Sequence, residues 1–185
     1  MRVITGSAKG RRLKEPDTME QRPTTDKVKE SMFNIIQFDL EGRRVLDLFA
    51  GTGQLGIEAL SRGASSAVFV DSSPKAVALI RENLERTKLE DKAAVLRSDW
   101  KDALRRERMP FDIILLDPPY DGTFLKNALK TVAEIDILSH NGIIVCESRA
   151  DTSLPDLAPP YEKLSEHRYG QVKLTLFIKR GAVSV

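Results

Sequence analysis

The sequence predicts an α/β protein with a seven-stranded, mostly parallel sheet, helices on both faces, an antiparallel last strand and an amino-terminal β-hairpin. Three observations predict this class. Short apolar runs alternate with helical patterns from residue 43 onward, an order that favours a parallel sheet covered on both faces. A glycine-rich turn follows the first of these runs. The last two runs flank Tyr169-Gly170, which indicates a hairpin and hence an antiparallel pair.

The amino-terminal part contains the predicted hairpin and a linker. Two short strands are expected over residues 2–5 and 11–14, joined through a segment with a glycine at each end. Residues 15–21 contain Pro16 and several charges without periodicity, which predicts an exposed linker.

The following elements alternate in type. A helix is expected to begin at a cap at Thr24 or Thr25 and to end near Phe38, because apolar residues recur at helical spacing. Strands are then expected over residues 43–49, 67–70, 93–97, 111–116 and 142–147. Helices are expected between them, over residues 55–62, 74–87, 101–108 and 123–135. The final hairpin is expected over residues 161–167 and 172–179.

Length and composition restrict the possible classes of protein. With 185 residues and a net charge of +2, the chain is expected to be one domain, with residues 1–21 as basic hairpin and linker and residues 22–185 as the core. Cys146 is the only cysteine, which excludes an intramolecular disulfide and a Cys/His zinc site, and we expect no metal. No signal-peptide pattern and no membrane-length apolar run is found, so a cytoplasmic protein is expected.

The first predicted strand of the core runs into the glycine-rich turn. Residues 47–56 read Asp-Leu-Phe-Ala-Gly-Thr-Gly-Gln-Leu-Gly, which fits the G-x-G-x-x-G spacing of backbone that approaches a ligand closely. Alone, this pattern also fits an ordinary strand-to-helix turn. Asp71 ends the next apolar run, where a carboxylate can accept both hydroxyls of a ribose. Together they predict a cofactor that contains a nucleoside.

A second motif, Asp117-Pro118-Pro119-Tyr120, directly follows a predicted buried strand. The two prolines stiffen this loop and carry no N–H groups. Asp47, Asp71, Asp99 and Asp117 all fall at or near strand ends, where ligands of open parallel sheets bind. Each of these acids alone could equally be a helix cap or a solvated loop residue.

These motifs resemble those of Rossmann-like S-adenosylmethionine-dependent methyltransferases, and most closely those of the bacterial RsmD family. The likeness covers nearly the whole chain, including Gly10-Arg11-Arg12-Leu13, Arg22-Pro23-Thr24, the glycine turn and the D-P-P-Y loop. It implies methylation of the guanine N2 amine in small-subunit (16S) ribosomal RNA. The implied partner is 16S rRNA in the small subunit or an assembly intermediate, and a monomer is expected.

The resemblance also implies roles for individual residues. The implied cofactor-binding residues are Asp47, Phe49, Ala50, Gly51, Gly53, Asp71, Ser72, Ser98, Asp99 and Trp100. The implied catalytic residues are Asp117, Pro118, Pro119 and Tyr120. Asp117 and the Pro118 carbonyl would orient the target amine, and Tyr120 would stack on a flipped base. Trp100 is expected near the adenine but could equally be a core residue.

Basic residues near the amino terminus suggest a surface that contacts RNA phosphates. The expected RNA-binding residues are Arg2, Lys9, Arg11, Arg12 and Arg22. On charge alone, the same residues also fit a solvated basic hairpin.

Three other functions compete with this interpretation. A nicotinamide-dependent oxidoreductase would explain the glycine turn and Asp71 but not the D-P-P-Y loop. A DNA adenine-N6 methyltransferase uses the same loop chemistry, although this chain has little room for a target-recognition region. A non-catalytic RNA-binding assembly factor would keep the fold, but the intact motifs count against it.

Overall fold

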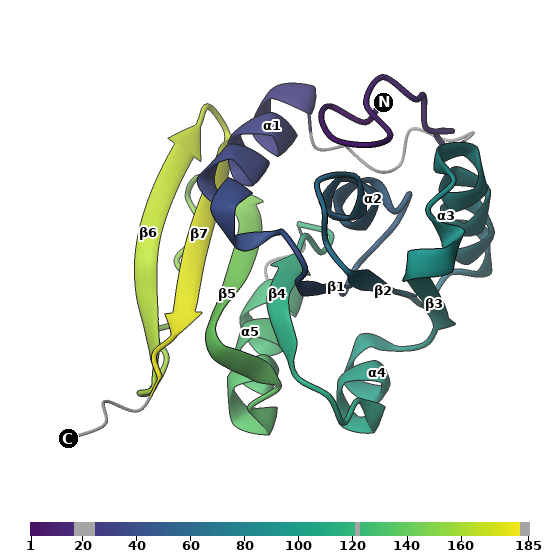
Figure 1. Ribbon diagram of the computed structural model, residues 1–185. Helices are drawn as coiled ribbons and strands as arrows, with labels where there is room; N and C mark the ends of the chain where they lie inside the picture. The colour runs from purple at the N-terminus through teal and green to yellow at the C-terminus, as the bar shows by residue number, and fades with distance from the viewer. Residues whose placement is uncertain (17–24, 121–122, 182–185) are drawn as a thin grey trace.

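A computed structural model describes residues 1–16, 25–120 and 123–181. In these residues one sheet holds seven strands in the order β3-β2-β1-β4-β5-β7-β6 (Figure 1). The strands are β1 (Arg44–Asp47), β2 (Ser66–Asp71), β3 (Ala93–Arg97), β4 (Phe111–Leu116), β5 (Leu138–Arg149), β6 (Tyr161–Tyr169) and β7 (Val172–Lys179). The helices are α1 (Asp26–Ile35), α2 (Gln54–Ser61), α3 (Pro74–Thr87), α4 (Trp100–Arg106) and α5 (Phe124–Ile135), with short 3₁₀ turns η1 (Gln37–Asp39) and η2 (Glu90–Lys92).

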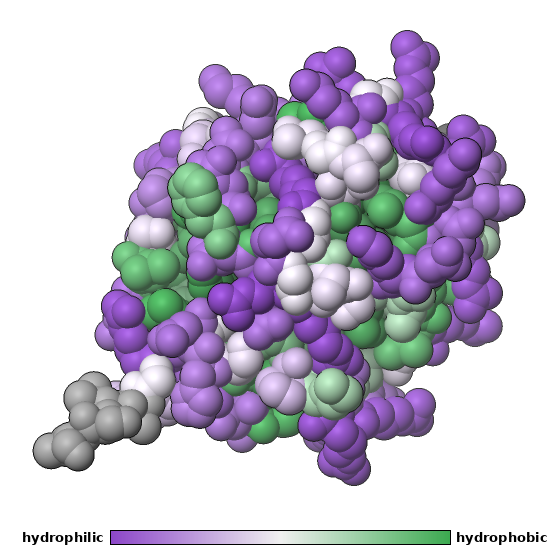
Figure 2. All heavy atoms as spheres, in the orientation of Figure 1, coloured by the Kyte–Doolittle hydropathy of each residue, from purple (hydrophilic) through white to green (hydrophobic). Residues whose placement is uncertain are grey.

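Helices cover both faces of the sheet because its inner strands, such as β2 and β4, are apolar on both sides. On β2, Ala67 and Phe69 pack in one core with α1, α2 and α3, whereas Val68 and Val70 pack in a second core with α4 and α5. This alternation follows from the two-residue period of a strand. Hydrophilic side chains cover most of the face seen in Figure 2, with apolar side chains in scattered groups between them. The structure has no helix long and apolar enough to cross a membrane, as judged on its described residues.

The predicted fold class is confirmed. β1 pairs in parallel with β2 and β4, and β7 runs antiparallel to both β5 and β6. Several boundaries differ from the prediction. Thr25 caps α1, but the α-helix ends at Ile35, and the next turn is η1. β5 begins at Leu138 and not at residue 142, because Leu138 already pairs with Phe111 of β4. The register shifts before Ile143, and in this interval Asn141 has a φ of 60°, which is unusual for a residue other than glycine.

The predicted amino-terminal hairpin is wrong in its extent. The two legs run antiparallel but form only one isolated bridge, between Arg2 and Arg12. The next N–H groups of the first leg are used elsewhere, since the carboxylate of Glu58 on α2 accepts from Ile4 N at 2.8 Å and from Thr5 N at 3.0 Å. These donors are therefore not available for a longer ladder. Except for Glu15 and Pro16, the predicted linker lies outside the described residues, as do Arg22 and Thr24.

Candidate functional site

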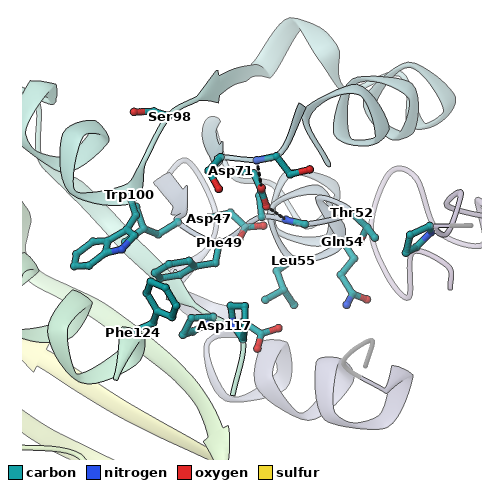
Figure 3. Close-up of a pocket in the computed structure, with 18 of the residues that line it drawn as sticks. Asp47, Phe49, Thr52, Gln54, Leu55, Asp71, Ser98, Trp100, Asp117 and Phe124 are labelled. Carbon is teal, nitrogen blue, oxygen red and sulfur yellow. Dashed lines mark hydrogen bonds between the residues drawn. The ribbon is translucent and has the colours of Figure 1, made fainter. Parts of the chain in front are cut away.

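A cavity of about 870 Å³ lies at the carboxyl ends of the parallel strands (Figure 3). Its walls come from the glycine turn after β1, the ends of β2 and β3, the loop after β4 and the start of α5. Met1, Glu15 and Pro16 of the amino-terminal segment complete the lining. Residues far apart in the sequence therefore meet at the edge where ligands of open parallel sheets bind.

The glycine turn needs glycine at three places for two different reasons. Gly51 and Gly53 have φ values of 53° and 78°, in the left-handed region that favours glycine. A Cβ at Gly56 would lie 2.3 Å from a ring carbon of Phe69 on β2, so this glycine permits close packing of α2 on the sheet. The spacing G-x-G-x-x-G is thus explained by the fold. Gly51 brings main chain to the cavity wall, whereas Gly53, also predicted to bind the cofactor, is not among the lining residues and faces Ile57 and Ile80.

Asp71 braces this turn from the end of β2. Its Oδ2 accepts a hydrogen bond from Gly51 N at 3.0 Å, and its Oδ1 accepts one from Ser73 N at 2.8 Å (Figure 3). A carboxylate oxygen can accept about two hydrogen bonds. Each oxygen of the half-buried Asp71 can therefore accept one more, which suits a pair of neighbouring hydroxyls.

Asp47, at the end of β1, is a buried carboxyl group with an unusual pKa. Its side chain is 1% exposed, and its Oδ2 accepts from Gly56 N at 2.9 Å. The pKa of Asp47 is raised to about 7. Burial is the largest cause and the negative charge of Asp71 adds to it, whereas the hydrogen bond from Gly56 N acts in the opposite direction. Asp47 therefore changes its charge close to neutral pH.

Aromatic rings form another wall of the cavity. The Phe49 ring centroid lies 6.1 Å from that of Trp100 and 6.4 Å from that of Phe124. Trp100 is 6% exposed, packs in the second core with α4 and α5, and also lines the cavity, whereas its place beside the adenine stays a prediction. Asp99 caps α4 by accepting from Lys101 N at 2.9 Å, and it lines the cavity as well.

The D-P-P-Y loop closes the cavity on the side of β4. All of its residues, from Asp117 to Tyr120, contribute to the lining. The Tyr120 side chain is 40% exposed, and its hydroxyl donates to Oε1 of Glu147 on β5 at 2.8 Å. The loop therefore lines the same cavity as the glycine turn, and Figure 3 shows Asp117 of the loop near Leu55 at the start of α2.

The predicted RNA-binding residues have different surroundings. Arg2 forms an ion pair with Asp26 at 3.4 Å, and Arg11 donates to the Arg86 carbonyl at 2.8 Å. Lys9 and Arg12 are exposed and form no ion pair within the described part of the chain. These two residues are thus the most available cations of the segment.

Buried polar side chains attach this segment to the core. Lys29 and Glu58 are fully buried, and Lys29 Nζ donates to the Arg2 carbonyl at 2.6 Å. Burial lowers the pKa of Lys29, and the neighbouring Glu58 raises it in part. On α3, the buried Asn83 bonds to both main-chain groups of Lys14 and also donates to the Thr52 carbonyl at 2.9 Å. Asn83 therefore connects the amino-terminal segment to the glycine turn.

Sequence reasoning missed several residues of the site. Gln54 and Leu55 occupy variable positions of the glycine motif, and nothing in the motif marks their side chains. Phe124 lies four residues after Tyr120. An aromatic residue so close to the D-P-P-Y loop could have been predicted to line the site. Glu147 lies near the carboxyl end of β5, so the reasoning applied to the four aspartates could have found it.

The lining fits S-adenosylmethionine. A ribose matches the remaining acceptor capacity of Asp71, an adenine matches the rings of Phe49 and Trp100, and the positively charged end of the molecule matches Asp47. Gln54 Oε1 is buried and has no hydrogen-bond partner in the described residues, although buried polar atoms are usually paired. A donor on a ligand in this cavity could satisfy it.

Comparisons with known proteins identify the family of this chain. The family model described as "Conserved hypothetical protein 95" matches residues 1–178. YlbH of Bacillus subtilis is 43% identical over 98% of this chain and 100% of that protein. Ribosomal RNA small subunit methyltransferase D of Escherichia coli is 32% identical over 96% of this chain and 89% of that protein. The solved structure of YhhF from E. coli is 29% identical, has a TM-score of 0.86 and covers 97% of this chain and 98% of that one. The cofactor is S-adenosylmethionine, and the chain belongs to the RsmD family of methyltransferases.

Proposed function

We propose that this protein transfers the methyl group of S-adenosylmethionine to the exocyclic N2 amine of a guanine in small-subunit (16S) ribosomal RNA. The observation that carries the proposal is that the D-P-P-Y loop and the Asp71-braced glycine turn line the same cavity. The name of the E. coli relative, a ribosomal RNA small subunit methyltransferase, supports this class of acceptor.

The loop offers what an amine acceptor needs. The sulfonium of the cofactor supplies an activated methyl group, so neither a metal nor a covalent nucleophile is required. An exocyclic amine is a poor nucleophile because its lone pair is delocalised into the base. Asp117 and the Pro118 carbonyl would accept hydrogen bonds from the two amine hydrogens and orient the nitrogen. This contribution is positioning and electrostatic stabilisation, not strong base catalysis. As the nitrogen–methyl bond forms, the sulfur–methyl bond breaks, S-adenosylhomocysteine leaves, and the methylated amine loses one proton to water.

Exposed rings at the cavity mouth suit a base that has left its stack. Tyr120 and Phe124 are 40% and 38% exposed, a high value for aromatic side chains that line a cavity. Stacking of a base on an aromatic ring contributes about 1–3 kcal/mol, which offsets part of the cost of unstacking it. Tyr120 is the ring that we assign to the target base, because it belongs to the same loop as Asp117.

The amino-terminal segment would contact the RNA backbone. Lys9 and Arg12 are exposed, and the same segment contributes Met1 and Glu15 to the cavity wall. Phosphates beside the target nucleotide would therefore lie close to these cations. Phosphate contacts position a nucleic acid without reading its sequence, so the choice of guanine must depend on the shape and context of the RNA.

The competing acceptor is adenine N6 in DNA, which the same loop chemistry could methylate. We favour ribosomal RNA because of the relatives at 32% identity or more and because the described chain adds only a short segment to the methyltransferase sheet.

Methyl transfer to several acceptors in parallel tests the proposal. Labelled S-adenosylmethionine would be offered to unmethylated small ribosomal subunits, their assembly intermediates, protein-free rRNA and duplex DNA, and the modified nucleoside then identified. N2-methylguanine in a ribosomal acceptor is the expected result. N6-methyladenine in DNA would show that the acceptor is DNA adenine and not ribosomal guanine. If no acceptor is methylated although the cofactor binds, a non-catalytic role is favoured.

A further inference from the structure

A buried carboxylate lies beneath the D-P-P-Y loop. β4 and β5 pair in parallel with Leu116 beside Cys146, so Glu147 lies next to the point where the loop begins. Glu147 is 3% exposed. A buried carboxylate is costly unless donors satisfy it, so its contacts indicate why it is there.

One of these donors is Tyr120. The tyrosine hydroxyl donates to Glu147 Oε1 at 2.8 Å, whereas the residue as a whole is 40% exposed and lines the cavity. The backbone fixes one end of this side chain, and the contact with Glu147 holds the opposite end. Together they restrict the direction of the ring while leaving it accessible. A tyrosine in an exposed loop would otherwise sample several rotamers.

We propose that Glu147 is a positioning residue that holds Tyr120 in the orientation in which the ring receives the target base. This inference rests on the proposed function of the same site. In this role Glu147 acts on the base through Tyr120 and needs no contact of its own with the base or the cofactor. Because the ring is oriented before the base arrives, less conformational freedom is lost when the two stack.

A double-mutant cycle tests this role. The variants are Tyr120→Phe, which removes the hydroxyl and keeps the ring, Glu147→Ala, and the two combined. The measurements are kcat and KM for the RNA acceptor, with the cofactor Kd by calorimetry. Each single variant is expected to lower kcat/KM about tenfold with the cofactor Kd within about twofold. The double variant should be no worse than either single one, because the same contact can be lost only once.

Two further variants complete the experiment. Glu147→Gln keeps a carbonyl acceptor of the same shape, so it should retain most of kcat/KM, and its remaining loss should vanish in the Tyr120→Phe background. This cycle also gives the answer if Glu147→Ala does not fold. Glu166→Ala, at an exposed glutamate on β6, is the matched control and should be neutral.

The outcomes separate this inference from the proposed function. Losses that multiply in the double variant, or full activity of both single variants, would overturn the role of Glu147 and leave the proposed function intact. If the wild-type protein itself methylates no RNA, the proposed function and the role of Glu147 are both overturned.

Discussion

The two halves of the cavity are constructed differently. On the half that we propose binds the cofactor, called the cofactor half, Asp47 and Asp71 accept hydrogen bonds from main-chain N–H groups of Gly51, Gly56 and Ser73. On the target half, Tyr120 and Phe124 present partly exposed rings, and Tyr120 is held through a side-chain contact. The first half is preorganised by main-chain hydrogen bonds, whereas the second leaves two aromatic residues partly exposed, as our proposal of an incoming base requires. The difference suggests that cofactor binding and target binding can be disrupted separately.

The largest expected effect comes from damage to the target half alone. Asp117→Ala should lower the rate of methyl transfer about 10²- to 10³-fold, because the amine loses an orienting acceptor. The cofactor Kd should stay within about twofold. Single-turnover methyl transfer and calorimetry measure the two quantities. Asp91→Ala, at an exposed acid in η2, is the control, and a large change in the cofactor Kd of Asp117→Ala would contradict the separation.

Damage to the cofactor half should have the reverse pattern. Asp71→Ala should weaken cofactor affinity about 10- to 100-fold, because hydrogen bonds to a charged group contribute about 1.5–3 kcal/mol. It also removes the acceptor for Gly51 N, so the melting temperature should fall. Calorimetry and thermal unfolding measure both effects, again against Asp91→Ala. Unchanged cofactor affinity would remove Asp71 from the site.

The basic segment extends the target half, and its contribution depends on salt. Lys9→Ala combined with Arg12→Ala should weaken RNA binding and reduce the slope of log K against log salt by about 1.4 to 1.8, equivalent to about two phosphate contacts. The matched control is Lys163→Ala with Arg168→Ala on β6, at the opposite edge of the sheet from the helix α3 (Figure 1). If the two double variants have the same slope of log K against log salt, Lys9 and Arg12 are solvated surface residues that do not contact RNA phosphates.

The smallest expected effect is a dependence of cofactor affinity on pH, through Asp47. Asp47, with a pKa of about 7, becomes ionised as the pH rises from 6 to 8. A positively charged ligand favours the ionised form, so cofactor affinity should rise several-fold over this range. Calorimetry on the protein and on Asp47→Asn, in which this contribution should be absent, measures the difference. Identical pH profiles for the two proteins would rule out a contact with the charged end of the cofactor.

The same group should affect the stability of the ligand-free protein in the opposite direction. The folded-state pKa of Asp47 lies above its ordinary value of 3.8, so between about pH 4 and pH 7 the folded state binds more protons than the unfolded state. The contribution of Asp47 to stability is therefore full below about pH 4 and is lost as the pH rises through 7. Denaturant unfolding should show this slope in the native protein and not in Asp47→Asn.

The sequence was sufficient for the order of strands and helices and for the motifs, because these depend on local periodicity and glycine spacing. It did not predict the short amino-terminal bridge, since the donors of Ile4 and Thr5 bind to Glu58, more than fifty residues away. It also missed Phe124 and Glu147, which join the site only through the packing of α5 and β5 beside the loop. Local sequence patterns do not predict contacts between elements that are far apart in the chain.

The attachment of the amino-terminal segment affects how truncation experiments should be interpreted. A chain without residues 1–14 would leave Glu58 without the N–H groups of Ile4 and Thr5, and Lys29 without the Arg2 carbonyl. Removing partners from buried ions costs several kcal/mol, a large share of the stability of a small domain. Loss of activity after such a truncation would therefore report partly on misfolding. A chimera that exchanges this segment between relatives would need to carry its partners in α1, α2 and α3 with it.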